Sequence, residues 1–219
     1  PFDNSEAYLR RDDFLAMTDE DRDAQKMVVI GCDFAVSKKD RANRTSFSVA
    51  GKCSRNLTHF FDQYVGRWDT LEWVNVMFDI QERHNPAVFF VEDGVIWKSI
   101  APTLYKEMQV RDIWLNCHAI VPIKDKAARG RPLQKRMRAG GCRFEKEAIW
   151  YPAFEAELLR FTGNSDAVAD DQFDSAALVV KGLEVMAEIE DEDFVDDDEI
   201  EFRRHDPVMH QGRSSVTGY

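Results

Sequence analysis

Short, strongly apolar segments alternate along the chain with longer segments in which apolar residues recur every three or four positions. The runs at 27–35 and 87–93 are almost wholly apolar, which is typical of strands buried on both faces. Residues 44–52 and 57–68 alternate between apolar and polar side chains, as half-exposed antiparallel strands do. The order of these segments predicts an early meander of three strands, followed by a second buried strand.

Helical periodicity fills most of the intervals between and after these strands. Apolar residues mark one face over 69–84, and the run from Thr18 to Asp21 is typical of a helix start. Further helices are expected over 5–26, 97–108, 132–139, 153–161 and from Asp170 to about Ala187, and further strands over 112–123 and 142–145. This order favours an α/β fold, a mixed sheet with helices on both faces.

Size and composition favour one main domain. The chain has 219 residues, of which 44% are apolar, enough for one sizeable core or one core with an appendage. No apolar run approaches the roughly 20 residues of a membrane helix, and the polar first residues do not resemble a signal peptide. We therefore expect an intracellular protein without a membrane partner. We predict an N-terminal helical linker segment over 1–26, the main domain over 27–190 and an acidic, flexible tail over 191–219.

The charge is unevenly distributed. The net charge is -11, but residues 188–201 alone hold ten acidic residues and no basic one. Residues 124–146 hold nine basic residues against two acidic ones, so an acidic protein still presents a basic segment to a polyanion. Gly130 and Pro132 should interrupt a helix there and leave a mobile loop or hairpin. We expect phosphate contacts without base specificity from four of these residues, Lys124, Lys126, Arg129 and Arg131, although a solvated helix face is the plainer alternative.

Carboxylates stand at the ends of the two apolar strands and at the start of the last helix. Asp33 ends the first strand and Glu92 the second, and the strand ends of an open α/β sheet meet at one crevice. The third group is Asp170, Asp171 and Asp174, for which helix capping is a competing explanation, strongest for Asp170. Crowded carboxylates repel one another unless they stay protonated or hold cations, and all-oxygen clusters suit Mg²⁺ or Mn²⁺. The combination indicates a phosphodiester nuclease with two metal ions.

Other catalytic chemistries lack a matching pattern. The four cysteines are scattered without a CxxC pair, which indicates neither a zinc site nor a disulfide framework. The sequence has no G-x-S-x-G motif and no Cys/His spacing typical of covalent catalysis.

Several segments in this order resemble the nuclease half of the large subunits of phage terminases, the DNA-packaging motors of tailed phages. The matching segments are IGCDFA (30–35), Asp40, FFVED (89–93), KDKAARGRPLQKRMRAGGCRF (124–144) and DDQFDSAA (170–177). The resemblance implies a ribonuclease H-like mixed sheet, an antiparallel three-strand meander plus parallel strands, flanked by helices. It also implies that Asp33, Glu92, Asp171 and Asp174 are catalytic and bind metal, with Asp170 ranked below them as a ligand.

The function that this resemblance implies is cleavage of double-stranded DNA, the concatemeric phage genome, during packaging. The expected partners are DNA and an upstream ATPase domain, a portal protein or a small terminase subunit, and the expected location is the cytoplasm of the infected bacterial host. The chain lacks a G-x-x-x-x-G-K-[ST] phosphate loop, so we expect no ATPase activity from it.

Three alternatives stay open. Another ribonuclease H-like nuclease, of resolvase or transposase type, would use the same acids on a different DNA. A non-catalytic domain that binds DNA or a packaging partner would use the acids as helix caps and solvated edges. An actin-like nucleotide-binding domain of similar topology would need glycine-rich phosphate-binding hairpins, which the sequence does not show.

Overall fold

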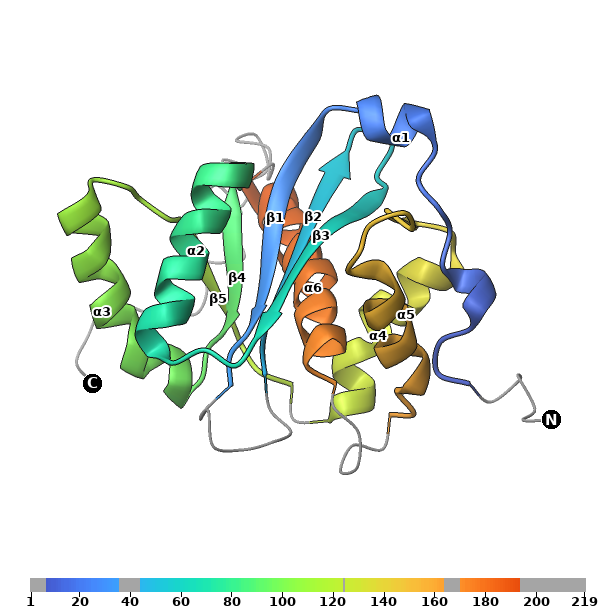
Figure 1. Cartoon of the computed structure of the whole chain (residues 1–219). Helices are drawn as coiled ribbons and strands as arrows, with labels where there is room; N and C mark the ends of the chain where they lie inside the picture. The colour runs from blue at the N-terminus through green and yellow to red at the C-terminus, as the bar shows by residue number, and fades with distance from the viewer. Residues whose placement is uncertain (1–6, 36–43, 124, 164–169, 194–219) are drawn as a thin grey trace, which may run out of the picture. The chain divides into compact units, whose positions relative to one another are not determined.

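Six strands form one sheet in the order β5-β4-β1-β2-β3-β6 (Figure 1). The computed structural model describes residues 7–35, 44–123, 125–163 and 170–193. The strands are β1 (Lys26–Asp33), β2 (Thr45–Cys53), β3 (Thr58–Gly66), β4 (Val88–Glu92), β5 (Cys117–Ile120) and β6 (Cys142–Phe144). β1, β2 and β3 are the antiparallel meander, whereas β4 is parallel to β1, β5 to β4 and β6 to β3. The predicted mixed sheet is confirmed.

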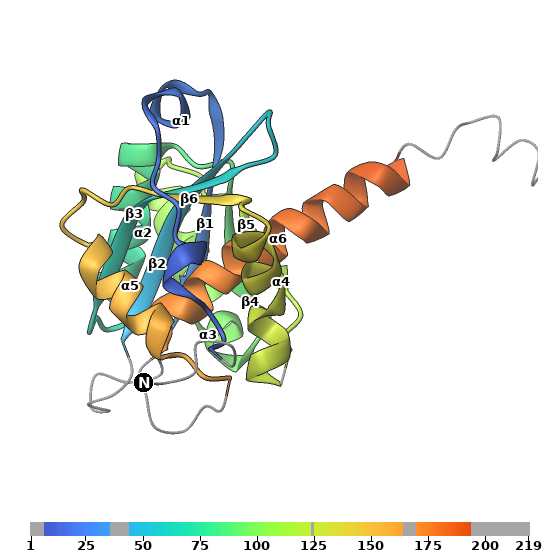
Figure 2. The ribbon, with the colours of Figure 1, turned by 90° about the vertical axis from the view of Figure 1, so that its right-hand side faces the viewer.

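Helices cover both faces of the sheet. On one face lie α2 (Thr70–His84) and α3 (Val95–Arg111), and on the other lie α4 (Lys126–Arg138), α5 (Tyr151–Arg160) and α6 (Asp171–Asp193) up to Gly182 (Figures 1 and 2). The chain divides after Gly182 into two compact units, and the described part of the second unit is the C-terminal part of α6. No described helix is long and apolar enough to cross a membrane.

The core beneath α2 and α3 is aromatic. Phe34, just after β1, stacks on Trp73 of α2 with ring centroids 4.6 Å apart. The Trp97 ring of α3 lies nearly parallel to the Phe34 ring, with centroids 6.4 Å apart. Asp69 begins α2 by accepting hydrogen bonds from the backbone amides of Leu71 and Glu72. The residues just beyond the end of β1 are therefore held by packing from this face of the sheet.

On the opposite face α6 lies directly against β1. A Cβ atom at Gly31 would collide with the backbone oxygen of Ser175, so only glycine permits this approach. The Ser175 hydroxyl lies 2.9 Å from that of Ser46 and 2.8 Å from that of Ser48, and Gln63 hydrogen-bonds both β2 serines. These buried polar contacts fix where the first turns of α6 sit over the sheet.

The N-terminal segment packs along the β6 edge. The backbone amide of Met17 donates to the oxygen of Phe144, whose amide donates to Leu15, so the segment extends the sheet by one bridge. Among the described residues 7–26, only η1 (Arg11–Asp13) and α1 (Asp19–Asp23) are helical, so the predicted helix over 5–26 is wrong for 7–10, 14–18 and 24–26. Backbone pairing with Phe144 of β6 replaces helix formation over 15–17, and residue 26 already belongs to β1.

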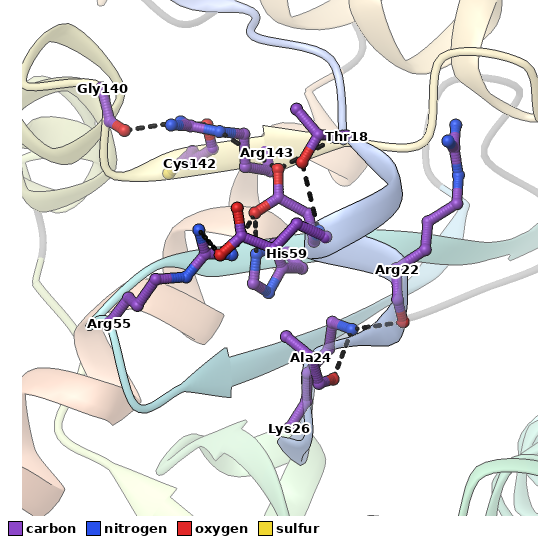
Figure 3. Close-up of polar contacts among 11 residues, drawn as sticks. Thr18, Arg22, Ala24, Lys26, Arg55, His59, Gly140, Cys142 and Arg143 are labelled. Carbon is purple, nitrogen blue, oxygen red and sulfur yellow. Dashed lines mark hydrogen bonds and ion pairs between the residues drawn. The ribbon is translucent and has the colours of Figure 1, made fainter.

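A buried carboxylate ties α1 to the sheet. Asp21 is 2% exposed and accepts hydrogen bonds from Arg55, at 2.7 Å, and from the backbone amide of Thr18, at 3.0 Å. His59 of β3 lies 3.3 Å from it and Arg143 of β6 lies 3.5 Å away. Figure 3 shows Thr18, Arg55, His59 and Arg143 converging on this point.

Three other element predictions need correction or adjustment. Helix α4 is continuous from Lys126 to Arg138, so Gly130 and Pro132 do not break it into a loop or hairpin; Gly130 is buried where α4 packs closely on Phe173 of α6. The strand predicted over 112–123 is confined to β5. Helix α6 continues to Asp193, into the predicted tail, and 194–219 lie outside the described residues.

Candidate metal centre

Two neighbouring parallel strands bring their terminal carboxylates to one edge of the sheet. Asp33 is the last residue of β1 and Glu92 the last of β4, and the register pairs Cys32 with Val91 just before them. Because parallel strands end on the same side, the two side chains emerge next to each other. Asp174 lies beside them in the first turn of α6. This helix can pack close to β1 because Gly31 has no side chain.

The three carboxylates line one small cavity. Asp33, Glu92 and Asp174 share its wall with Arg129 and with an apolar side that includes Ile120, Pro122 and Ala177. Its volume of about 20 Å³ has room for one water- or ion-sized species. The geometry thus places three acids, two basic residues (Arg129 and Lys181) and an apolar wall around a single small space.

Burial and repulsion by neighbouring carboxylates raise the pKa of Asp33 and of Asp174. Burial, followed by the charges of Asp174, Asp171 and Glu92, raises the pKa of Asp33 well above its usual range. Burial likewise raises the pKa of Asp174 to about 7, although the nearby Arg129 opposes the shift. A divalent cation among these groups would relieve the repulsion, which is the electrostatic condition of a metal site.

Each aspartate at the start of α6 has a basic partner. Arg129 donates to Asp174 at 2.9 Å, and Lys126 donates to Asp170 at 2.6 Å. Asp171 pairs with Arg44, which stands directly before β2, at 3.1 Å. Lys126 and Arg129 of α4 therefore neutralise the acidic cluster rather than pointing away from it.

The donor set fits a divalent cation. The Oδ1 atom of Asp174 is buried and has no hydrogen-bond partner among the residues that the structure describes. An unsatisfied carboxylate oxygen beside a small cavity is where a hard cation would find a ligand. Within the described ranges, however, no three His, Cys, Asp or Glu side chains are already gathered as an ion-binding group, so the carboxylates would have to draw together to bind one.

The candidate acids separate into two groups. Asp33, Glu92 and Asp174 line the cavity, whereas Asp170 and Asp171 do not. The backbone carbonyl oxygen of Asp170 accepts a hydrogen bond from the backbone amide of Asp174, as that of the residue before a helix does.

The candidate DNA-binding residues also differ. Lys126 and Arg129 are half-buried beside the centre, and Arg131 is exposed on the same helix. Lys124, like Asp40, lies outside the described residues.

Sequence patterns did not point to Arg44 and Glu157. Arg44 contacts both Asp171 and the buried Glu157 of α5. These residues lie 127 and 113 positions from Arg44. The one available signal is weak: a lone carboxylate among the apolar positions of the α5 helix.

Comparisons with known proteins rest on structure alone. No protein-family model matches the chain, and no curated protein matches its sequence. The structure is similar to the large terminase nuclease from thermophilic phage G20c with bound cobalt, with a TM-score of 0.55 and 16% identity; the match covers 83% of this chain and 98% of that one. It is also similar to the human cytomegalovirus terminase nuclease domain, manganese-soaked and inhibitor-bound, with a TM-score of 0.54 and 10% identity, covering 80% and 94% of the two chains.

A third similar structure is longer. The large terminase from the thermophilic bacteriophage D6E in complex with ADP has a TM-score of 0.52 and 14% identity, and the match covers 82% of this chain but 43% of that one. The chain thus spans less than half the length of that protein. At these identities the likeness shows the fold, and the predicted ribonuclease H-like architecture, the one that terminase nuclease domains have, is confirmed.

Proposed function

We propose that this chain is a metal-dependent endonuclease that hydrolyses phosphodiester bonds of double-stranded DNA during the packaging of a phage genome. The observation that carries the proposal is the convergence of Asp33, Glu92 and Asp174 on one small cavity, with a buried Asp174 oxygen left without a partner. Three carboxylates in one place are costly unless a cation joins them.

Asp33, Glu92 and Asp174 would hold Mg²⁺ or Mn²⁺. The bound metal would supply Lewis-acid polarisation of the phosphate and a water of lowered pKa. The cavity has room for one ion-sized species, so a second ion requires Arg129, which lines the cavity, to move away from Asp174. Binding of two ions is thus coupled to a rearrangement of the Arg129 side chain.

The basic residues of α4 would bind the DNA backbone. Arg129 lines the cavity, Lys126 pairs with the neighbouring Asp170, and Arg131 lies exposed on the same helix. When a metal takes over the neutralisation of Asp174, Arg129 becomes available for phosphate oxygens, and Lys126 and Arg131 would add further contacts. Such contacts fix the position of DNA without reading its sequence.

The similar structures suggest a setting for this activity. By analogy with the D6E large terminase, which was solved with ADP, the chain would work with an ATPase domain, and a portal protein or small terminase subunit would be further partners. The activity would take place in the cytoplasm of the infected host. No ATPase activity is expected from the chain itself, because its sequence lacks a phosphate-binding loop.

Cleavage of supercoiled plasmid tests the proposal. The chain is incubated with Mn²⁺, Mg²⁺ or EDTA, alongside Asp33→Asn, Glu92→Gln and the matched control Asp79→Asn, an exposed acid of α2. Nicking and linearisation should need the metal and fall by about 100-fold or more in the first two variants, since loss of a ligand exceeds the roughly 10–100-fold effect of outer partners. Asp79→Asn should cut like the wild type.

The opposite result has a clear meaning. If the folded wild type is inert at saturating Mn²⁺, or if Asp33→Asn cuts as fast as the wild type, the nuclease proposal is wrong. Branched and linear DNA substrates, compared in the same assay, separate a packaging nuclease from a resolvase-type enzyme.

A non-catalytic binding domain is the second candidate. The observation that favours it is that Asp170, Asp171 and Asp174 all have basic partners already, as structural ion pairs do. The two functions differ in metal dependence. A metal that binds the folded state raises the melting temperature by mass action, so a binding domain of this kind would show no rise with Mn²⁺.

A further inference from the structure

Arg44 holds both oxygens of Asp171. Its backbone amide donates to Oδ1 at 3.3 Å and its Nε to Oδ2 at 3.1 Å. Both oxygens of Asp171 are therefore engaged by one residue at the start of β2, and Asp171 does not line the cavity. The carboxylate is 7% exposed, so this pairing is shielded from solvent.

The same arginine is held by a second, more deeply buried carboxylate. Its Nη2 donates to Glu157 Oε2 at 2.6 Å, and Glu157 of α5 is 2% exposed. Glu157 also accepts the backbone amide of Gln172 at 2.6 Å and its side-chain amide at 2.7 Å. A carboxylate that receives a helix N-terminal amide and a guanidinium at once fixes both donors.

These contacts join three segments that are far apart in the sequence. The start of β2, the middle of α5 and the first turn of α6 meet at the pair formed by Arg44 and Glu157. A helix turns by 100° per residue and rises 1.5 Å, so fixing Asp171 and Gln172 also fixes the direction of the side chain at 174. Asp174 is then directed at the cavity that Asp33 and Glu92 line.

We propose that Arg44 and Glu157 are positioning residues that hold Asp171 as an anchor, so that Asp174 alone among the α6 aspartates faces Asp33 and Glu92 and binds the metal. The inference rests on the proposed function, because it assigns roles within the same centre. Asp171, Arg44 and Glu157 act on the metal through the placement of Asp174, and none of them touches it.

Titration with Mn²⁺, followed by calorimetry and by the rise in melting temperature, tests the inference without measuring nuclease activity. The variants are Asp174→Asn, Asp171→Asn, Arg44→Gln and Glu157→Gln, with Glu155→Gln as the control on the same helix. Asp174→Asn should weaken Mn²⁺ binding by about 100-fold or more. The three anchor variants should each weaken it by about 10-fold, the lower end for an outer partner of a ligand. Glu155→Gln should bind like the wild type.

A double variant separates positioning from a general loss of stability. Because the ion pair between Arg44 and Glu157 couples their separate contacts with Asp171 and Gln172, the effects of the two substitutions should not add. The Arg44→Gln/Glu157→Gln variant should therefore bind Mn²⁺ clearly less than about 100-fold more weakly than wild type. Arg44→Lys, which keeps the charge but not the planar guanidinium, should recover part of the affinity.

Each failure is recognisable. If the wild type binds no Mn²⁺, the proposed function falls and the positioning role falls with it. If the wild type binds but Asp171→Asn abolishes binding as completely as Asp174→Asn, Asp171 is a ligand and only the positioning inference is wrong. The inference is equally wrong if Arg44→Gln and Glu157→Gln lower the melting temperature but leave the Mn²⁺ affinity unchanged.

Discussion

At the residue scale, what distinguishes the acidic side chains of the centre is their immediate partners. The Asp170 carboxylate accepts a hydrogen bond from Lys126, and both oxygens of the Asp171 carboxylate accept hydrogen bonds from Arg44, whereas Asp174 keeps one buried oxygen unsatisfied. Aspartates no more than four positions apart therefore differ in whether a buried carboxylate oxygen remains available to bind a cation. For the same reason the two neighbouring arginines differ. Arg129 is paired with Asp174 and therefore responds to the charge of the centre, whereas Arg131 is exposed.

The first prediction concerns Arg129. Replacing it by alanine leaves the buried Asp174 carboxylate, beside Asp33 and Asp170, without its cation, which should cost about 1–3 kcal/mol of unfolding free energy in EDTA. Saturating Mn²⁺ should recover most of this loss, because the metal compensates the same charge. Urea denaturation with and without Mn²⁺ measures both values.

Arg131→Ala is the matched control for that comparison. Arg131 is exposed on the same helix, so its removal should change stability by no more than about 0.5 kcal/mol. Equal losses in the two variants, or an Arg129→Ala loss that Mn²⁺ leaves untouched, would contradict a role for Arg129 in neutralising the centre.

At the scale of elements, the contact between β1 and α6 decides whether the centre exists. Gly31 allows the helix backbone to approach the strand, and the hydroxyl contacts of Ser175 with Ser46 and Ser48 fix its position along the strand. Glu157 and Arg44 set the rotation of the helix at its first turn. Three independent contacts thus control one helix.

The second prediction is that Gly31→Ala damages both stability and metal binding. Its Cβ would meet the backbone oxygen of Ser175, which cannot rotate away, so α6 must shift. We expect a loss of about 1–3 kcal/mol, as for overpacked sites, and weaker Mn²⁺ binding because Asp174 moves away from Asp33. Urea denaturation and calorimetric titration give the two values.

Gly94→Ala provides the comparison. A Cβ there would meet only the Glu92 oxygen, at 3.9 Å, and the residue has extended backbone angles, so its cost should stay within about 1 kcal/mol for a helix N-cap. If Gly31→Ala proves as mild as Gly94→Ala, the close approach of α6 to β1 does not control the centre.

At the scale of the whole molecule, the N-terminal segment is attached to the sheet through Asp21. Burial alone would raise the pKa of this carboxyl, but hydrogen bonds from Thr18 and His59 outweigh it and lower the pKa to about 2 from 3.8. A depressed folded-state pKa adds stability above the unfolded value, and that stability is lost as the pH falls from about 4 towards 2. Acid should therefore loosen this attachment.

The third prediction follows from the lowered pKa of Asp21. At pH 7, Asp21→Asn should be less stable than the wild type by about 1–3 kcal/mol, because Arg55 and His59 lose their charged partner. The difference between the two proteins should shrink between pH 4 and 2, where the wild-type carboxyl itself becomes neutral. Urea midpoints across this range measure it, and a difference that is constant with pH would show that the Asp21 charge does not stabilise the fold.

The sequence by itself determined most of the elements and the general location of the centre. Periodicity is a local property, and so the apolar runs that end at Asp33 and Glu92 predicted two buried strands, which the structure shows as parallel neighbours. The sequence pattern also predicted the three-strand meander and the α2 helix. Local signals failed where packing overrides them, as at Gly130 and Pro132, which lie inside the continuous α4 helix.

Only the tertiary structure separated Asp171 from Asp174. Capping, ion pairing and metal binding all favour Asp at a helix start, so the sequence analysis ranked Asp170 below the other two but left Asp171 and Asp174 equivalent. Their partners Arg44, Lys126 and Arg129 come from positions 44 to 127 residues away. Which carboxylate keeps an unsatisfied oxygen depends on these long-range contacts, and no local pattern encodes them.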